Sequence, residues 1–300
     1  MLAELDRLGT IAAVAKSLNL TAPGISMQLA SLEREIGVKL TEKHGRRIVV
    51  TPAGRILARH ASGIVDMLTV AEMEVASIRA GSVGTYRVAA FPTAARAIFP
   101  GAWKTIASVD DRGLQLGLVE LEPSVSIPAL PAGEIELAVA HHYSNMPPLV
   151  GPGLIVTPIA TETIRLAVNT ADPRIDTAGP VDLGDFAGHD WIVPSREWRC
   201  YDMVHRATDL AGFEPRAVAE ATDFTVQLAL VAAGVGVALI PQLGAVHVPQ
   251  NVSLVELETP VYRHIVLISR RASAADAGLK RIMSALSAAA AVELPSVAVS

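Results

Sequence analysis

Residues 21–33 read TAPGISMQLASLE, and this stretch predicts the amphipathic helix that decides the fold of the N-terminal part. Its apolar residues Ile25, Leu29 and Leu32 recur every three or four positions, which is the spacing of one buried helical face. Thr21 stands where an N-cap belongs, and Pro23 falls in the first turn, where its missing N–H costs nothing. The opposite face carries hydrogen-bonding side chains, namely Ser26, Gln28, Ser31 and Arg34.

A shorter helix is predicted directly before this one, over residues 11–18, with only Asn19 and Leu20 between the two. Asn tolerates the left-handed conformation that so tight a turn often needs. Two helices joined in this way, the second with a polar face, are typical of a helix-turn-helix whose second helix enters the major groove of DNA. Helix pairs with polar outer faces also occur in proteins that bind no DNA, so the neighbouring residues must decide.

A basic turn follows the second helix. Lys43, Arg46 and Arg47 lie between two short extended pieces, residues 39–40 and 48–50. A two-stranded wing with these cations at its tip would place them where a phosphate backbone passes. The alternative is a solvated basic loop.

Composition separates a basic head from an acidic body. Residues 1–60 contain nine Lys and Arg against five Asp and Glu, a balance of +4, whereas the remaining 240 contain 16 against 25, a balance of −9. This asymmetry favours a nucleic-acid-binding module joined to a second part, and 300 residues predict two or three domains. The first residues lack the apolar segment of a signal peptide, the apolar run 228–241 is too short to span a bilayer, and a single cysteine excludes an internal disulfide. We therefore expect a cytoplasmic protein that does not enter a membrane.

A long helix is predicted to begin at Thr51-Pro52 and to end near Gly81. Along it, apolar residues alternate by four and three positions, which is a heptad seam about three heptads long. The seam consists of Leu57, Ala61, Ile64, Leu68, Ala71, Val75 and Ile78. The simplest partner for such a seam is the same helix of a second copy of the chain, and the alternative is that it packs along its own body.

An ordered set of residues between positions 10 and 60 matches a known family. The set comprises Ala12, Ala13, Ala15, Leu18, Thr21, Pro23, Ile25, Ser26, Gln28, Leu32, Glu33, Gly37 and Leu40, followed by Thr51-Pro52-Ala53-Gly54. In order and spacing it resembles the winged helix-turn-helix of the LysR-type transcriptional regulators. Ala22 and Thr41 depart from that pattern, standing where the family favours Gln and Phe.

The resemblance implies a transcription regulator that binds double-stranded DNA as a homodimer or homotetramer and that can contact RNA polymerase. In this interpretation Ser26, Gln28 and Ser31 lie nearest the base edges, while charged and polar neighbours hold phosphates. The expected DNA-binding residues are Thr21, Pro23, Gly24, Ser26, Met27, Gln28, Ser31, Arg34, Lys43, Arg46, Arg47 and Thr51.

From Tyr86 onward, short β-rich runs alternate with helical stretches, which predicts α/β lobes with largely parallel sheets. The expected strands are residues 86–90, 114–121, 136–140, 164–168, 235–240 and 265–269. Residues 212–215 and 232–241 resemble the effector-binding region of the same family, which is similar to two-lobed periplasmic binding proteins. The resemblance implies a winged head over 1–51, a dimerising linker helix over 52–81, and an effector domain over 85–300. Its first lobe would take about 85–158 and 263–292, and its second about 159–262.

In such a body a small ligand binds between the lobes, at strand ends and helix N-termini. Polar residues in the corresponding connections are the candidate effector ligands, and with helix N–H groups they would suit a carboxylate or another anionic metabolite. Each of them could equally serve only as a helix cap. They are Thr93, Ala94, Ser124, His141, Ser195, Arg196, Thr222 and Asp223.

Other chemistries find little support in the sequence. Gly234 and Gly236 precede a strand and therefore indicate a turn, not a dinucleotide site. His141 and His142 have no third ligand at a recognisable spacing, so no metal is expected, and Cys200 is expected to pack. We expect no cofactor and no enzymatic activity. Two alternatives remain, a cytoplasmic two-lobed solute-binding protein and an α/β enzyme with an accessory helical head.

Overall fold

The structure, a computed structural model, divides into two compact units, Met1–Ala76 and Ser77–Ser300, which are described separately. The residues it describes are 1–44, 47–61, 64–65, 85–108, 114–147, 151, 153–173, 175 and 179–295, without the side chains of residues 43, 44 and 47. Among these residues, no helix is both long and apolar enough to cross a membrane.

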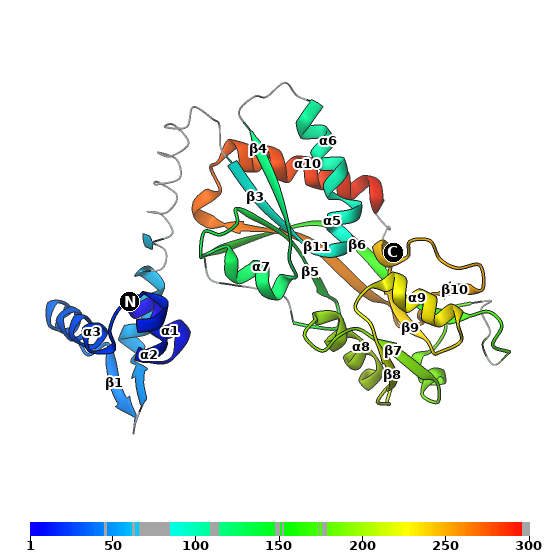
Figure 1. Cartoon of the computed structure of the whole chain (residues 1–300), viewed down its shortest axis with the longest axis horizontal. Coiled ribbons are helices and arrows are strands. Elements are labelled where there is room, and N and C mark those ends of the chain that lie inside the picture. Colours follow the sequence, from blue (N-terminus) through cyan, green and yellow to red (C-terminus); the bar gives the residue numbers. More distant parts are fainter. Residues whose placement is uncertain are drawn as a thin grey trace. The chain divides into compact units, whose positions relative to one another are not determined.

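Three helices build the N-terminal unit: α1 (Leu2–Leu8), α2 (Ile11–Ser17) and α3 (Ala22–Ile36) (Figure 1). The Thr21 hydroxyl accepts a hydrogen bond from the Gly24 amide at 3.3 Å and caps α3, as its sequence predicts. Asn19 has a φ of 53°, which makes the turn between α2 and α3, and Gly37 with a φ of 75° ends α3.

A two-stranded antiparallel wing follows, made of β1 (Thr41–His44) and β2 (Arg47–Val50), with Thr41 opposite Val50. The prediction that residues 39–40 form its first strand is wrong. The wing packs its apolar side on the helices, since one core holds the buried residues Leu2, Leu5, Val14, Ile25, Leu29, Leu40 and Val50.

The carboxylate of Glu33 explains why the strand begins late. Its Oε1 accepts hydrogen bonds from the amides of Leu40 and Thr41 at 3.0 and 2.8 Å, and from the Thr41 hydroxyl at 3.0 Å. Its Oε2 accepts from Lys39 Nζ at 2.8 Å. These bonds occupy the amide of Leu40 and fix the connection between α3 and the wing.

Replacing Glu33 by Gln is expected to destabilise the N-terminal unit by about 1–3 kcal/mol at neutral pH, because buried donors lose a charged acceptor. Burial works to raise the pKa of Glu33, but the hydrogen bonds from Lys39, Thr41 and Leu40 outweigh it and lower that pKa from 4.5 to about 2. A lowered pKa stabilises the fold above pH 4.5, and this contribution is lost as the pH falls toward 2. The acid-induced loss of helical circular dichroism should therefore flatten in Glu33→Gln. It should persist in Glu35→Gln, an exposed position on the same helix.

The linker helix begins as its sequence predicts, since residues 52–61 are helical. Leu57 packs against the core of the N-terminal unit, so this seam position already has a partner within its own chain. Ile64 is 64 % exposed. Ala61 is half-buried, and the remaining seam positions Leu68, Ala71, Val75 and Ile78 lie outside the described residues.

A seven-stranded mixed sheet organises the C-terminal unit, in the order β10-β6-β11-β5-β3-β4, with β9 also paired to β6. Its strands are β3 (Thr85–Ala90), β4 (Gln115–Glu120), β5 (Leu137–Tyr143), β6 (Leu154–Asn169), β9 (Ala238–Pro241), β10 (Val252–Val255) and β11 (Val261–Arg270). A separate parallel pair joins β7 (Asp190–Val193) to β8 (Arg216–Glu220).

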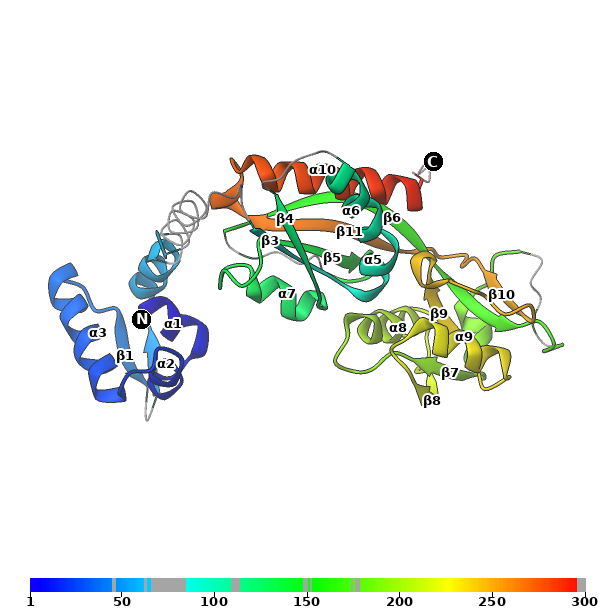
Figure 2. The ribbon, with the colours of Figure 1, turned by 45° about the horizontal axis from the view of Figure 1, so that its top comes forward.

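The prediction of largely parallel sheets is wrong. The pairs β3–β4 and β3–β5 are parallel, but β6 and β11 run antiparallel to each other and to their other neighbours. The first part of β6 pairs with β11 and its last part with β9 and β10, so this 16-residue strand belongs to both lobes. Figure 2 shows β6 and β11 continuing from one lobe into the other.

Helices cover both faces of the first lobe (Figures 1 and 2). On one face, α5 (Pro92–Ala97), α6 (Phe99–Ser108) and α10 (Ala277–Glu293) share a core with β3, β5 and β11. On the other face, α7 (Pro123–Ala129) packs against Ala138, Ala140 and Val266.

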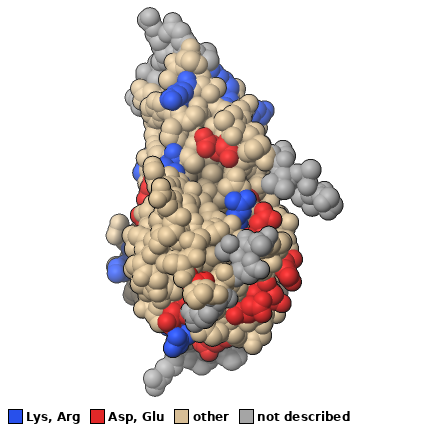
Figure 3. Space-filling view, turned by 90° about the vertical axis from the view of Figure 1, so that its right-hand side faces the viewer, with Lys and Arg blue, Asp and Glu red and all other residues tan. Residues whose placement is uncertain are grey.

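The second lobe surrounds β7 with α8 (Arg199–Leu210) and α9 (Phe224–Ala232). Trp191 of β7 is fully buried, and its indole N–H donates to the Phe186 carbonyl at 3.2 Å. Short 3-10 helices span Leu183–Phe186, Gln242–Gly244 and, in the first lobe, Arg271–Ser273. On the face in Figure 3, Asp and Glu gather toward one end, in keeping with the acidic balance of the body.

Candidate functional site

The outer face of α3 is open to a partner. Ile25 and Leu29 are buried against the core, whereas Ser26, Met27 and Gln28 are exposed, Met27 by 72 %. The Ser26 hydroxyl donates to the Ala22 carbonyl at 3.1 Å, which turns its oxygen along the helix. Arg34 is exposed about two turns further along. This is the surface that a recognition helix presents to a major groove.

One expected DNA contact does not fit. The Thr51 side chain is 8 % exposed, and its hydroxyl donates to the Lys39 carbonyl at 2.9 Å and accepts from the Gly54 amide at 3.0 Å. Thr51 therefore joins the linker helix to the wing and has no group left to offer a phosphate. Arg46 and the side chains of Lys43 and Arg47 lie outside the described residues.

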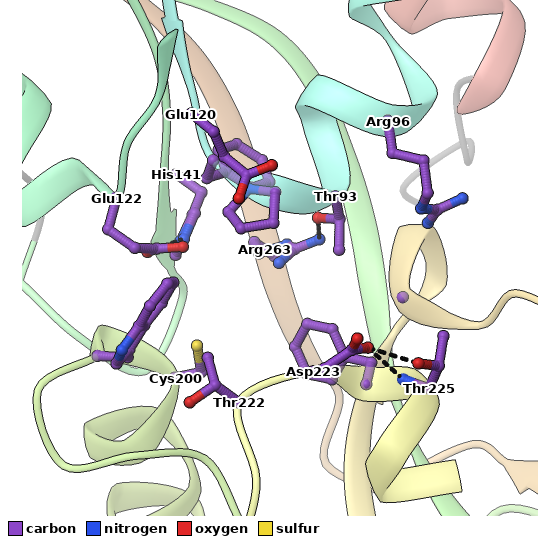
Figure 4. Close-up of a pocket in the computed structure, with 15 residues that line it drawn as sticks. Thr93, Arg96, Glu120, Glu122, His141, Cys200, Thr222, Asp223, Thr225 and Arg263 are labelled. Atoms are coloured by element: carbon purple, nitrogen blue, oxygen red, sulfur yellow. Dashed lines mark hydrogen bonds and ion pairs between the residues drawn. The ribbon is translucent and has the colours of Figure 1, made fainter. Parts of the chain in front are cut away.

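A cavity of about 460 Å³ lies between the two lobes (Figure 4). Four of the eight expected effector ligands line it, namely Thr93, His141, Thr222 and Asp223. Thr93 is on α5, His141 on β5, and Asp223 caps α9 by accepting from the amide and hydroxyl of Thr225 at 2.7 Å.

The other four expected ligands do not line the cavity. Ala94 is 1 % exposed within the hydrophobic core of the first lobe, and Ser124 is exposed on α7. The Ser195 hydroxyl donates to Glu220 at 2.7 Å, and the Arg196 guanidinium lies 5.6 Å from the centre of the Tyr201 ring. Ser195 and Arg196 therefore contact neighbours within the second lobe, Ser124 faces solvent, and Ala94 is enclosed in the first lobe.

His141 and His142 lie within β5 and not after it, because the pairing with β11 continues to Tyr143. Their side chains point to opposite sides, as expected from a strand. His141 faces the cavity, whereas the ring of His142 lies 4.8 Å from that of His264. In the part of the chain that the structure describes, no three His, Cys, Asp or Glu side chains gather as metal ligands.

A buried ion pair lies at the wall of the cavity, and sequence reasoning missed it. Arg263 Nε donates to Glu162 Oε1 at 2.6 Å, and Arg263 Nη2 donates to the Thr93 hydroxyl at 2.9 Å. The Leu243 amide donates to Glu162 Oε2 at 2.6 Å. The available signal was a charged residue two positions before each of the expected strands 164–168 and 265–269. In the structure Arg263 and Glu162 are 1 % and 0 % exposed.

Further charged residues complete the lining: Arg96 on α5, Glu120 at the end of β4 and Glu122 before α7. The Arg96 guanidinium donates to the Leu243 carbonyl. Figure 4 shows Arg96 and Thr93 on one side of the cavity and Glu120, Glu122 and His141 on the other.

Burial controls the protonation of the lining groups. It raises the pKa of Glu122 to about 7, although Arg263 lowers it and Glu120 raises it further. Burial, with the charge of Arg263, holds the pKa of His141 well below its ordinary value, so the imidazole is neutral. Burial and then the Glu122 carboxylate raise the pKa of Cys200 to about 11, which keeps the thiol protonated at neutral pH. The arrangement is suited to binding a small polar molecule.

Comparison with known proteins identifies both parts of the chain. Residues 1–55 match the model of the bacterial regulatory helix-turn-helix proteins of the lysR family, and residues 79–291 match the LysR substrate binding domain. The transcriptional regulator ClcR of Pseudomonas putida is 27% identical over 236 residues, covering 78% of each chain. IlvR of Caulobacter vibrioides is 25% identical over 277 residues, covering 90% of each.

Solved structures agree in fold. Full-length CbnR, a LysR family transcriptional regulator, superimposes on 96% of this chain and 96% of its own with a TM-score of 0.53 at 24% identity. Full-length BenM gives a TM-score of 0.59 at 21% identity, covering 97% of this chain and 95% of its own. The proteins of this family are transcription regulators and not enzymes, which removes the enzyme alternative. With its N-terminal helix-turn-helix head and its two-lobed effector-binding domain, this chain belongs to the LysR family of DNA-binding transcriptional regulators.

Proposed function

We propose that the effector of this regulator is a small molecule with a carboxylate or other anionic group, and that it binds in the cavity between the lobes. The observation that carries the proposal is the position of Arg96 and Thr93 on one side of that cavity, beside the buried Arg263. Guanidinium and hydroxyl groups are suited to a carboxylate. A ligand that contacts both lobes stabilises the arrangement of lobes to which it binds best, and so shifts the population.

The test is a thermal-shift and calorimetric screen of small carboxylates against the full chain and two variants. Arg96→Gln removes a cation from the cavity, whereas Lys104→Gln removes an exposed cation of α6 that does not line it. Carboxylates that bind the wild type should bind Arg96→Gln about tenfold or more weakly, because a charge-assisted hydrogen bond is lost. Equal affinities for the two variants would contradict the assignment of this cavity.

On DNA, the proposed reading residues are Ser26, Gln28 and Ser31, and the proposed phosphate contacts are Thr21, Arg34, Lys43, Arg46 and Arg47. The exposure of Ser26 and Gln28 supports these two positions, whereas Ser31 is half-buried and its hydroxyl donates to Glu35 at 3.5 Å. Met27, Pro23 and Gly24 complete the surface of the first turns. The regulator would act in the cytoplasm, and a bound effector would change the spacing of paired heads and thereby DNA bending or polymerase contact.

The linker helix is proposed to join two chains along the heptad seam, giving a dimer that can pair into a tetramer. Ile64→Asp with Leu68→Asp should dissociate the assembly, because two charges would enter each apolar seam. Sedimentation velocity of the full chain measures the change. The control is Val65→Asp with Thr69→Asp, one position off the seam, which should leave the assembly intact. An unchanged sedimentation coefficient for the seam variant would rule the seam out as the interface.

A further inference from the structure

The carboxylate of Glu122 lies in the cavity wall. Among the described residues, no basic side chain donates a hydrogen bond to its Oε2 atom. Its Oε2 atom is buried and makes no hydrogen bond among the described residues. The nearest basic atom is His141 Nε2 at 3.5 Å, and that imidazole is neutral. Arg263 lies nearby, but its Nε is committed to Glu162 at 2.6 Å.

His141 lies beside Glu122 in the wall of the same cavity. The residue is 1 % exposed, and its Nδ1 has no hydrogen-bond partner in the described part of the chain. Because Nε2 is the nitrogen nearer the Glu122 carboxylate, a neutral imidazole carries its proton there and leaves Nδ1 as an acceptor. That N–H lies 3.5 Å from Glu122 Oε2 and does not satisfy it, so the Glu122 carboxylate favours a ligand group rich in N–H.

The charged residues that line the cavity also favour a ligand with a cationic group. Glu120 adjoins Glu122, and Asp223 faces the cavity from the second lobe, so three carboxyl groups line a cavity with two guanidinium groups. Of the two, Arg263 is paired with Glu162 and Arg96 donates to a backbone carbonyl. Trp198 also lines the cavity, and an indole ring attracts cations.

We propose that the effector carries a protonated amine that Glu122 binds, so that it is an amino acid or a similar amino-carboxylate and not a simple organic acid. The inference rests on the proposed function, in which the Arg96 and Thr93 side takes the carboxylate. The opposite wall then takes the ammonium group, which donates its N–H groups to the Glu122 carboxylate.

Binding should be linked to the ionisation of Glu122. The titratable and charged groups that face it are His141 of β5, Glu120 of β4, Arg263 of β11 and Cys200 of α8. With a Glu122 pKa of about 7, an ammonium ligand prefers the ionised carboxylate and releases a proton on binding. The affinity should then rise about tenfold between pH 6 and pH 8. A ligand carbonyl that accepts from protonated Glu122 would give the opposite trend.

The experiment screens the standard amino acids against the full chain by thermal shift, each beside the carboxylic acid that lacks its amino group. Calorimetry in buffers of different ionisation enthalpy then measures affinity and proton release for the best pair. We expect an amino acid to bind at least about tenfold more tightly than its deaminated partner, as loss of a charge-assisted hydrogen bond requires. Glu122→Gln should remove this difference and the pH dependence, whereas Glu134→Gln, exposed and outside the cavity, should change neither.

Each other outcome overturns the inference. If the deaminated acid binds as tightly as the amino acid, or if affinity falls as the pH rises, the amine site is wrong. If simple carboxylates bind and their affinity depends on Arg96, while no amino acid binds, the proposed function stands and this inference fails. If no compound of either series binds, both are contradicted.

Discussion

Glu162→Leu is expected to destabilise the C-terminal unit by about 3–5 kcal/mol, because it leaves the Arg263 guanidinium buried without its counter-charge. The geometry makes the cost large: the pair is 1 % and 0 % exposed, and the same carboxylate also accepts from the Leu243 amide at 2.6 Å. All three tryptophans, Trp103, Trp191 and Trp198, lie in this unit. Urea unfolding followed by tryptophan fluorescence therefore measures the free energy of unfolding of the C-terminal unit and does not report on the N-terminal unit.

The matched variant is the double substitution Glu162→Leu with Arg263→Leu. Replacing both partners of a buried ion pair by apolar residues is often nearly neutral, so the double variant should recover most of the lost free energy of unfolding. It should nevertheless lose affinity for any effector that depends on the Arg263 side of the cavity. The ion pair would not determine the stability of this unit if the single variant had a free energy of unfolding within about 1 kcal/mol of wild type. The same conclusion would follow if the double variant were no more stable than the single one.

Gly54→Ala is expected to unfold the DNA-binding head selectively. A Cβ at position 54 would lie 2.2 Å from the Leu40 carbonyl oxygen and 2.6 Å from the Val50 side chain, and backbone atoms cannot yield as a side-chain end can. Overpacking of this kind costs about 1–3 kcal/mol or more. The close approach gives a physical reason for the glycine in the stretch Thr51–Gly54.

The measurement is amide hydrogen exchange over residues 1–61 together with DNA affinity. Gly54→Ala should lose protection in this segment and bind DNA at least about tenfold more weakly, while the fluorescence-detected unfolding of the C-terminal unit stays unchanged. His60→Ala, exposed on the same helix, serves as the control. Normal protection in Gly54→Ala would mean that the linker helix can move away from the wing without cost.

The sequence predicted the features that depend on neighbours along the chain. Thr21 caps α3, Asn19 takes the left-handed turn and Gly37 ends the helix, because each role is set within a few residues. Thr222 and Asp223 were predicted as site residues from their position before a helix. Asp223 is the N-cap of α9, and both residues line the cavity.

Features set by distant pairing were missed. The direction of β6 and the length of β5 depend on β11, roughly one hundred residues later in the chain, and local patterns carry no signal for such pairings. The ion pair of Glu162 and Arg263 could not be predicted for the same reason, because its two residues are far apart in the sequence. Ser195 was a reasonable candidate by position, but Glu220 on a neighbouring strand takes its hydroxyl.

The central claim, that this chain is a sequence-specific DNA-binding regulator, is tested most directly by fluorescence anisotropy of the full chain. Binding to the DNA upstream of its own gene is compared with a shuffled fragment of the same length at several salt concentrations. We expect a preference of about a thousandfold or more for its own upstream DNA, with log affinity falling linearly as log salt rises. Equal affinity for the two fragments at every salt concentration would contradict the claim.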